Sequence, residues 1–246
     1  FKRGMRTLHV PTSLLGMVDA AIGGKNGLNV NQIKNAVGTI TPPEAILIHA
    51  PFLDTLPEEE IYAGLGEMLK HAILSGESHW RELIHHWHDK EQRPKLIEDS
   101  AQVKWQIVAE DPYEQGIRQQ LNLGHSVGHA LESAALANGR PIPHGIAVAV
   151  GLIIESAIAA EMNLASMAFV NEVKDGVLRM IPMPTTLPSF SELSPFLYQD
   201  KKNVHGAIKC SLPLGFGRVK HQIEVDLACM QNAYNTHIQH LFSHPL

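Results

Sequence analysis

R-Q-Q-L-N-L-G-H-S-V-G-H-A-L-E, residues 118–132, is the stretch that says most about the fold of this chain. Its pattern favours a helix over about residues 118–138. His125 and His129 lie four positions apart, so on a helix both imidazoles point from one face, which suits either zinc or a hydrogen-bonded structural pair. The zinc-protease motif needs a glutamate where this chain has Ser126, so a metalloprotease is excluded.

The chain before and after this stretch is expected to be mainly helical. Thr55 and Glu58 form a capping-box signature, and apolar residues then recur on one face until Gly76. A helix over residues 144–163 is apolar nearly all round, which predicts a central place in a bundle. Two more helices are predicted, over residues 78–88 and 93–110.

Strands are predicted at both ends of the chain. Thr7–Val10 and Ala45–His49 are short β-type runs, separated by a glycine-punctuated loop near Lys25. Ile181–Pro195 contains four prolines and is predicted to be a connection. Ile208–Val225 alternates around two glycines, which predicts a β-hairpin. We therefore expect two parts, a small α/β piece at residues 1–57 and a mainly helical domain at residues 58–246.

The composition favours a globular protein with a small-molecule partner. The 246 residues are 44% hydrophobic and carry a formal net charge of -5. No basic stripe indicates nucleic acid, and the apolar run Ile146–Ile154 is shorter than the roughly 20 residues that cross a bilayer. Cys210 and Cys229 lie in no metal-ligand or disulfide spacing. We expect a cytoplasmic protein that binds neither nucleic acid nor a membrane.

Two further segments carry candidate ligands for a metal ion. His144 follows Pro143 at the start of the apolar helix and is a plausible third imidazole ligand. Glu67 and Lys70 lie in an otherwise apolar helix, where a buried charge is costly unless it is paired or bound to metal. Glu67 is therefore either a metal ligand or half of a surface ion pair with Lys70.

Many basic residues lie near glycines and histidines. They would form a pocket for an anionic substrate if they gather, although scattered solvated charges are the simpler interpretation. The residues concerned are Arg3, Lys25, Lys34, Lys104, Arg118, Lys201 and Lys202.

Taken in order, these segments resemble the 3-dehydroquinate synthases of the sugar-phosphate cyclase superfamily. Single pieces are common, but the ordered set is specific and covers nearly the whole chain. The matching segments are P-T-S-L-L from Pro11, V-D-A-A-I-G-G-K-N-G-L-N from Val18, K-N at Lys34, T-L-P-E-E-E from Thr55, G-L-G-E-M-L-K from Gly64, residues 118–132, P-H-G from Pro143, D-K-K from Asp200 and L-P-L-G-F-G from Leu212.

The resemblance implies a metal- and NAD-dependent lyase of the shikimate pathway that acts as a homodimer. Glu67, His125 and His144 would hold zinc or cobalt. The substrate would be 3-deoxy-D-arabino-heptulosonate 7-phosphate, and Arg3 would reach its phosphate, either within the same subunit or from the other subunit of a dimer. The other implied substrate contacts are Asp19, Lys25, Asn35, Lys70, Lys104, Arg118, Asn122, His129 and one of Lys201 or Lys202. The residues implied to line the NAD site are Thr12, Ser13, Asp19, Lys34, Thr55, Leu56 and Glu60.

The implied reaction is redox-neutral. NAD takes a hydride from the carbon-5 hydroxyl, phosphate leaves, the hydride returns, and an aldol step closes the ring. The implied fold is the helical domain of a 3-dehydroquinate synthase, preceded by a remnant of the α/β nucleotide-binding domain.

This chain departs from the family pattern in three ways. The family's glycine-rich nucleotide loop would lie before Phe1, so we expect the chain alone to bind NAD poorly and to turn over little. Ile146 replaces a common acidic residue, and Asn26 replaces a common threonine.

Three alternatives remain. A sister cyclase, such as a 2-deoxy-scyllo-inosose or valiolone-type synthase, shares the metal and NAD, but Arg118, Asn122 and His129 favour 3-dehydroquinate synthase. Glycerol dehydrogenase and the iron alcohol dehydrogenases share the architecture but fit the G-G-K and D-K-K motifs less well. The last alternative is a catalytically inactive helical fragment that serves as an interaction module.

Overall fold

The computed structural model describes residues 5–30, 33–198 and 208–241, without the side chains of residues 29–36 and 239–241. The described chain is mainly helical, as expected. Its α-helices are α1 (Glu58–Ser75), α2 (Glu77–His86), α3 (Arg93–Glu110), α4 (His125–Ala137), α5 (His144–Glu161), α6 (Met167–Met180), α7 (Phe190–Leu197) and α8 (Leu227–Leu241). The shorter helical segments are η1 (Gly16–Ala20), a π-helix, and the 3₁₀ helices η2 (Ala50–Thr55) and η3 (Ile117–Asn122).

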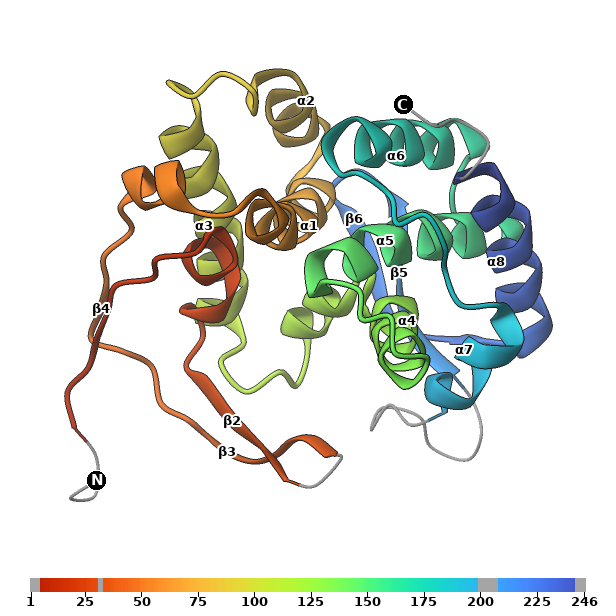
Figure 1. Ribbon diagram of the computed structural model, residues 1–246, viewed down its shortest axis with the longest axis horizontal. Coiled ribbons are helices and arrows are strands. Elements are labelled where there is room, and N and C mark those ends of the chain that lie inside the picture. Colours follow the sequence, from red (N-terminus) through yellow and green to blue (C-terminus); the bar gives the residue numbers. More distant parts are fainter. Residues whose placement is uncertain (1–4, 31–32, 199–207, 242–246) are drawn as a thin grey trace.

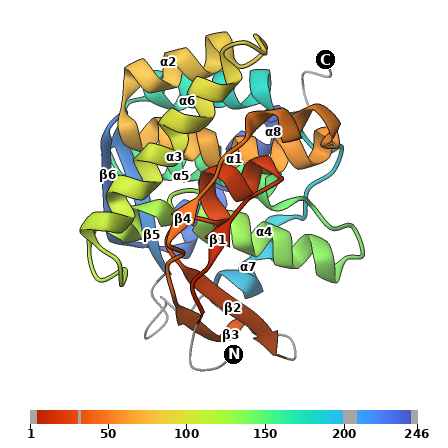
Figure 2. The same cartoon turned by 90° about the vertical axis from the view of Figure 1, so that its left-hand side faces the viewer.

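Three two-stranded sheets accompany the helices. Strands β1 (Leu8–His9) and β4 (Ala45–Ile46) pair in parallel. Strands β2 (Lys25–Val30) and β3 (Ile33–Ile40) form an antiparallel arm that projects from the helical body in both views (Figures 1 and 2). Strands β5 (Ile208–Gly215) and β6 (Arg218–Val225) form the hairpin that the sequence predicts at residues 208–225.

Helix α5 lies at the centre of the helical body (Figure 1). It packs against α1, α4, α6, α8 and β5. Its composition alone would suit a membrane span, with a mean hydropathy of 1.5, but 83% of this helix is buried inside the protein. A helix that is apolar all round is stable when other elements cover every face, so α5 serves as the core of the bundle.

The predicted helix over residues 118–138 is wrong as a single element. The chain forms η3, turns at Leu123 and Gly124, and restarts as α4 at His125. Gly124 has a φ of 77°, a left-handed conformation that glycine adopts without a steric penalty, so the turn occurs there. His125 is consequently the first residue of a helix rather than a residue in its middle.

Two other sequence predictions are corrected by the structure. Thr55 does not cap α1, because it ends η2 and Pro57 precedes the first turn instead. The segment Ile181–Pro195 is not only a connection, since α7 begins within it. Ser189 and Glu192 form a capping box there.

Some elements were missed or misplaced by the sequence patterns. Helices α6 and α8 were not predicted, and the loop predicted around Lys25 is in part strand β2. The predictions over residues 93–110, 144–163 and 78–88 agree with α3, α5 and α2 to within two residues at each end. That residues 1–57 are the remnant of a nucleotide-binding domain stays a prediction.

Candidate active site

Three potential metal ligands meet from three different helices. Glu67 belongs to α1, while His125 and His144 are the first residues of α4 and α5. The Oε1 atom of Glu67 lies 3.4 Å from Nε2 of His125 and 3.3 Å from Nε2 of His144. Glu67 is fully buried, so its carboxylate is not a surface group.

Backbone contact between α1 and α5 brings Glu67 beside His144. A Cβ atom added at Gly66 would lie 2.0 Å from the carbonyl oxygen of Gly145, and one added at Gly145 would lie 2.0 Å from that of Ala63. The two helices therefore touch at residues adjacent to the two ligands. Only glycine permits this approach, because a real Cβ atom never comes so near to an oxygen.

The Nδ1 atom of each imidazole, which is not the one that faces Glu67, lies close to an oxygen acceptor. Nδ1 of His125 lies 3.0 Å from the carbonyl oxygen of Leu123, and Nδ1 of His144 lies 3.3 Å from Oε2 of Glu132. A carbonyl oxygen only accepts, so Nδ1 of His125 carries the proton and Nε2 presents its lone pair to Glu67. Such partners orient histidine ligands in metal sites.

Charges around Glu67 favour its ionised form. Burial by itself would raise the pKa of Glu67, but Lys70 and His125 hold it well below its usual range. Lys70 is itself buried and forms an ion pair with Oε2 of Glu67. Among the described residues, the buried Oε1 atom has no hydrogen-bond partner.

The two histidines differ in their ease of protonation. Burial and the nearby Lys70 lower the pKa of His125, which keeps it neutral. Burial opposes the charge on His144 too, but the neighbouring carboxylates of Glu132 and Glu67 outweigh it and raise its pKa to about 9. His144 is therefore protonated at neutral pH, and its positive charge lies beside the Glu67 carboxylate, where a metal cation would also be attracted. The unpartnered carboxylate oxygen and the two inward-facing nitrogens fit a divalent ion such as zinc.

A second ion pair lies next to this cluster. Lys104 of α3 donates to Oδ1 of Asp19 at 2.5 Å and to the Asp19 carbonyl oxygen at 2.6 Å. Burial would raise the pKa of Asp19, but Lys104 lowers it below its usual value. Segment η1, which carries Asp19, packs against both α1 and α3. Asp19 and Glu67 are thereby held as neighbouring carboxylates, each paired with a lysine.

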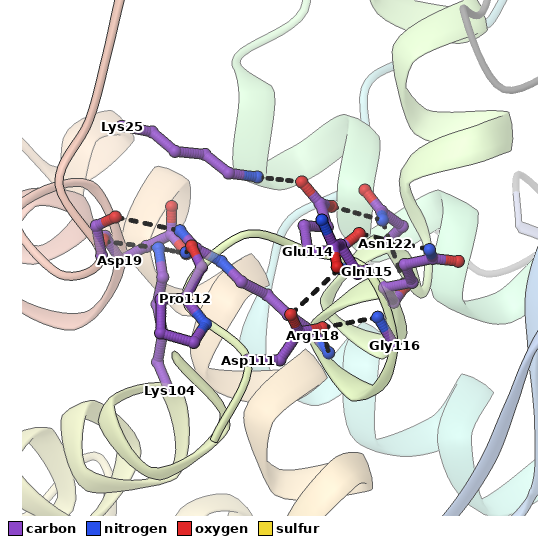
Figure 3. Close-up of polar contacts among 12 residues, drawn as sticks. Asp19, Lys25, Lys104, Asp111, Pro112, Glu114, Gln115, Gly116, Arg118 and Asn122 are labelled. Carbon is purple, nitrogen blue, oxygen red and sulfur yellow. Dashed lines mark hydrogen bonds and ion pairs between the residues drawn. The ribbon is translucent and has the colours of Figure 1, made fainter. Parts of the chain in front are cut away.

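Glu114 connects two of the expected substrate contacts (Figure 3). Lys25 forms an ion pair with Oε2 of Glu114, and Asn122 donates to Oε1 at 2.9 Å. Glu114 has a φ of 59°, an uncommon conformation for a residue with a side chain. Residues with such uncommon backbone conformations cluster at functional sites, so Glu114 is a further candidate site residue.

Arg118 lies below this group and is almost fully buried (Figure 3). Its guanidinium donates to the carbonyl oxygens of Pro112, at 2.5 Å, and Gly23, at 3.1 Å. The Asp111 carboxylate accepts the Arg118 amide at 3.1 Å. Arg118 therefore joins the loop before β2 to the turn before η3.

His129 lies beside the two histidine ligands. Its ring centroid is 5.1 Å from that of His125 and 5.8 Å from that of His144. The side chain is exposed, unlike those of the metal cluster. The predicted common face of His125 and His129 is therefore present, although the helix begins at the first of them.

The remaining expected residues lie elsewhere or beyond the described chain. Thr12 and Ser13 precede η1, Thr55 and Leu56 end η2, and Glu60 lies in the first turn of α1. Lys34 and Asn35 lie on β3, but their side chains are outside the described part. Arg3, Lys201 and Lys202 fall outside the described residues.

Glu132 and Glu114 were missed by the sequence analysis. Glu132 follows His129 by three positions, and this helical spacing would have predicted that it lies near the histidines. Glu114 lies in an irregular turn, where no periodicity indicates the direction of a side chain.

Comparison with known proteins gives the same family over most of the chain. The chain matches the C-terminal model of 3-dehydroquinate synthase over residues 64–203 and the N-terminal model over residues 1–63. It is 38% identical over 224 residues to the 3-dehydroquinate synthase of Parabacteroides distasonis, covering 89% of this chain and 64% of the relative. It is 35% identical to that of Sulfolobus acidocaldarius over 243 residues, covering 94% of this chain and 67% of the relative.

A solved sister enzyme has a similar structure. The 2-epi-5-epi-valiolone synthase from Streptomyces hygroscopicus, solved with NAD+ and Zn2+ bound, superposes with a TM-score of 0.85 at 28% identity. The superposition covers 97% of this chain and 68% of that one. The chain thus spans less than two thirds of the Parabacteroides relative, 64%, and its matches run through both family models. This chain belongs to the 3-dehydroquinate synthase family.

Proposed function

We propose that the full-length protein is a 3-dehydroquinate synthase that converts 3-deoxy-D-arabino-heptulosonate 7-phosphate to 3-dehydroquinate and phosphate. The observation that carries the proposal is the buried Glu67 carboxylate, whose Oε1 faces the Nε2 atoms of His125 and His144 at 3.4 and 3.3 Å. Relatives that carry this name are 35% and 38% identical over most of the chain.

Glu67, His125 and His144 would hold the divalent ion, zinc or cobalt. When bound, the ion would supply Lewis-acid stabilisation of negative charge on substrate oxygens. The 28% identical valiolone synthase binds Zn2+, which supports the choice of ion. The protein's contribution is a rigid, mostly buried site in which Leu123 and Glu132 orient the two imidazoles.

The amines around the cluster would bind the anionic substrate. Lys25 is half exposed and Lys104 largely buried, and each now neutralises a carboxylate of the protein, Glu114 or Asp19. A phosphorylated sugar acid would compete for these ammonium groups and orient by them. The other proposed contacts are Arg3, Asn35, Lys70, Arg118, Asn122, His129 and Lys201.

Proton movements would involve the exposed histidine. His129 lies at the open side of the cluster, so its imidazole can reach a substrate proton while His125 and His144 are engaged with Glu67. NAD would supply the hydride acceptor and donor. The residues proposed to line its site are Thr12, Ser13, Asp19, Lys34, Thr55, Leu56 and Glu60; the exposure of Thr12, Thr55 and Glu60 leaves their polar groups accessible to a ligand.

A sister cyclase is the second candidate, because the valiolone synthase superposes with a TM-score of 0.85. The two candidates differ in substrate and product. Only a 3-dehydroquinate synthase forms a product that dehydroquinase converts onward.

The test uses the full-length protein with NAD and zinc. We expect release of phosphate from 3-deoxy-D-arabino-heptulosonate 7-phosphate, and a product that dehydroquinase consumes. Glu67→Gln should lose about tenfold or more in zinc affinity and most of the activity, because it removes the one anionic ligand. Glu82→Gln, an exposed residue of α2, is the control and should match the wild type. A folded, zinc-loaded wild-type enzyme that releases no phosphate would refute the proposal.

A further inference from the structure

One buried carboxylate has no part in the proposed chemistry. Glu155 of α5 is 0% exposed and lies among the apolar residues of the central helix. It follows His144 by eleven positions, about three helical turns, so the two side chains leave α5 on the same side. Burying a carboxylate is costly unless strong hydrogen bonds compensate.

Glu155 binds the beginning of α4. Its Oε2 accepts from the backbone nitrogen of Gly124 at 2.6 Å, and its Oε1 accepts from that of Val127 at 3.1 Å. These amides flank His125, the first residue of the helix. The first amides of a helix have no partner within it, so a carboxylate across the helix interface satisfies them and interacts favourably with the helix dipole.

Close packing against α5 holds the same turn as well. A Cβ atom added at Gly151 would lie 2.0 Å from the carbonyl oxygen of Gly124. The backbone of α5 thus contacts the left-handed Gly124 directly, one turn before Glu155 reaches its amide. One steric contact and two hydrogen bonds therefore fix the start of α4 against α5.

We propose that Glu155 is a positioning residue for the metal site, an inference that rests on the proposed function. Helix α5 carries His144 at its start and, through Glu155, holds His125 at the start of α4. One helix therefore sets the separation of the two imidazoles. A carboxylate accepts with both oxygens, whereas an amide would turn an NH₂ group toward one of the two backbone donors.

The experiment compares Glu155→Gln with Ser156→Ala in the full-length protein. Ser156 is the next residue of α5, is also fully buried, and donates to the carbonyl oxygen of Leu152 at 2.7 Å. Glu155→Gln should weaken zinc binding about tenfold or more and alter the visible absorption bands of the cobalt-substituted protein. Ser156→Ala should lower the melting temperature yet keep the wild-type affinity and cobalt spectrum.

Two outcomes overturn the inference. One is a folded Glu155→Gln variant with wild-type zinc affinity and cobalt spectrum; the other is a Ser156→Ala variant that loses affinity equally. If Glu155→Gln does not fold, Glu155→Asp replaces it, since the shorter acid keeps the charge but cannot reach both amides; the same two readouts then decide. Failure of the wild type to bind zinc would instead refute the proposed function.

Discussion

At the scale of single residues, the candidate metal site depends on which nitrogen of each imidazole faces Glu67. The acceptor behind His144 is the carboxylate of Glu132, 3.3 Å from Nδ1. A carboxylate behind a histidine fixes the ring and makes its other nitrogen a better ligand. We predict that Glu132→Gln lowers zinc affinity by about 10- to 100-fold, measured by competition with a chromophoric chelator.

The matched control for this prediction is Glu161→Gln, at the last residue of α5, where the carboxylate accepts from Asn232 instead. That variant should bind zinc like the wild type. If Glu132→Gln also binds like the wild type, the carboxylate does not orient His144.

His71 predicts a dependence of stability on pH. It is fully buried, with Nδ1 2.9 Å from the hydroxyl of Ser100, and burial together with the charge of Lys70 lowers its pKa from 6.5 to about 3. Between about pH 3 and pH 6.5 the unfolded chain binds a proton at His71 that the folded protein does not. The contribution of His71 to the free energy of unfolding is therefore fully present above pH 6.5 and is lost as the pH falls toward 3. The loss attributable to His71 is about 1.4 kcal/mol between pH 7.5 and 5.5.

The measurement is urea unfolding of the wild type and His71→Asn at both pH values, with a metal chelator present. The variant keeps a donor near Ser100 but cannot titrate, so its stability should fall by less than that of the wild type. His88→Asn, at an exposed histidine, should reproduce the wild-type difference. An equal fall in wild type and His71→Asn would contradict the prediction.

At the scale of elements, the glycines beside the ligands control how closely the helices approach. Gly145 contacts the backbone of α1, and an added Cβ atom would lie 2.0 Å from the carbonyl oxygen of Ala63. We predict that Gly145→Ala lowers the free energy of unfolding by about 1–3 kcal/mol, because the helices must move apart. The same movement should weaken zinc binding, since it separates Glu67 from His144.

Gln102→Ala is the control for this prediction. Gln102 is exposed in the middle of α3, where alanine is a favourable helix residue, so this variant should keep the wild-type stability and zinc affinity. Chemical denaturation and zinc titration of the two variants give the comparison. Equal stability of Gly145→Ala and the wild type would show that the α1–α5 contact can relax.

The sequence predicted elements well where the signals were local. Helix α3 begins and ends where its pattern indicates, α1 ends before Gly76, and the β5–β6 hairpin turns around its glycines. The break before α4 was missed, because Gly124 is held there by Glu155, a residue 31 positions further along. Local patterns do not report such a contact.

The candidate site was also predicted only in part from the sequence. The resemblance identified Glu67, His125 and His144, and the structure brings these three together. It did not identify Glu132 or Glu155, whose roles depend on the packing of α4 against α5 rather than on a motif. The contacts of Glu132 with His144 and of Glu155 with the start of α4 exist only once the helices have packed.

At the scale of the whole molecule, the candidate metal site joins three helices through one central helix. Helices α1 and α4 both pack on α5, and each of the three contributes one ligand near its backbone contact with a neighbour. Unfolding would separate Glu67 from His144 by the 76 residues between them in the chain. A bound ion therefore opposes the separation of the helices, and metal binding should be coupled to global stability.

We predict that zinc stabilises the folded protein, by about 2.7 kcal/mol when the free ion is at a hundredfold excess over its dissociation constant. Thermal unfolding with zinc and with a chelator measures the difference. Magnesium at the same concentration is the matched control and should have no effect, because it prefers oxygen ligands and keeps its water, whereas two of the three ligands here are imidazoles. Glu67→Gln should abolish most of the zinc effect. Equal stabilisation of that variant would mean that zinc acts through other histidines of the chain, and the cluster of Glu67, His125 and His144 would then not be the site that couples metal binding to folding.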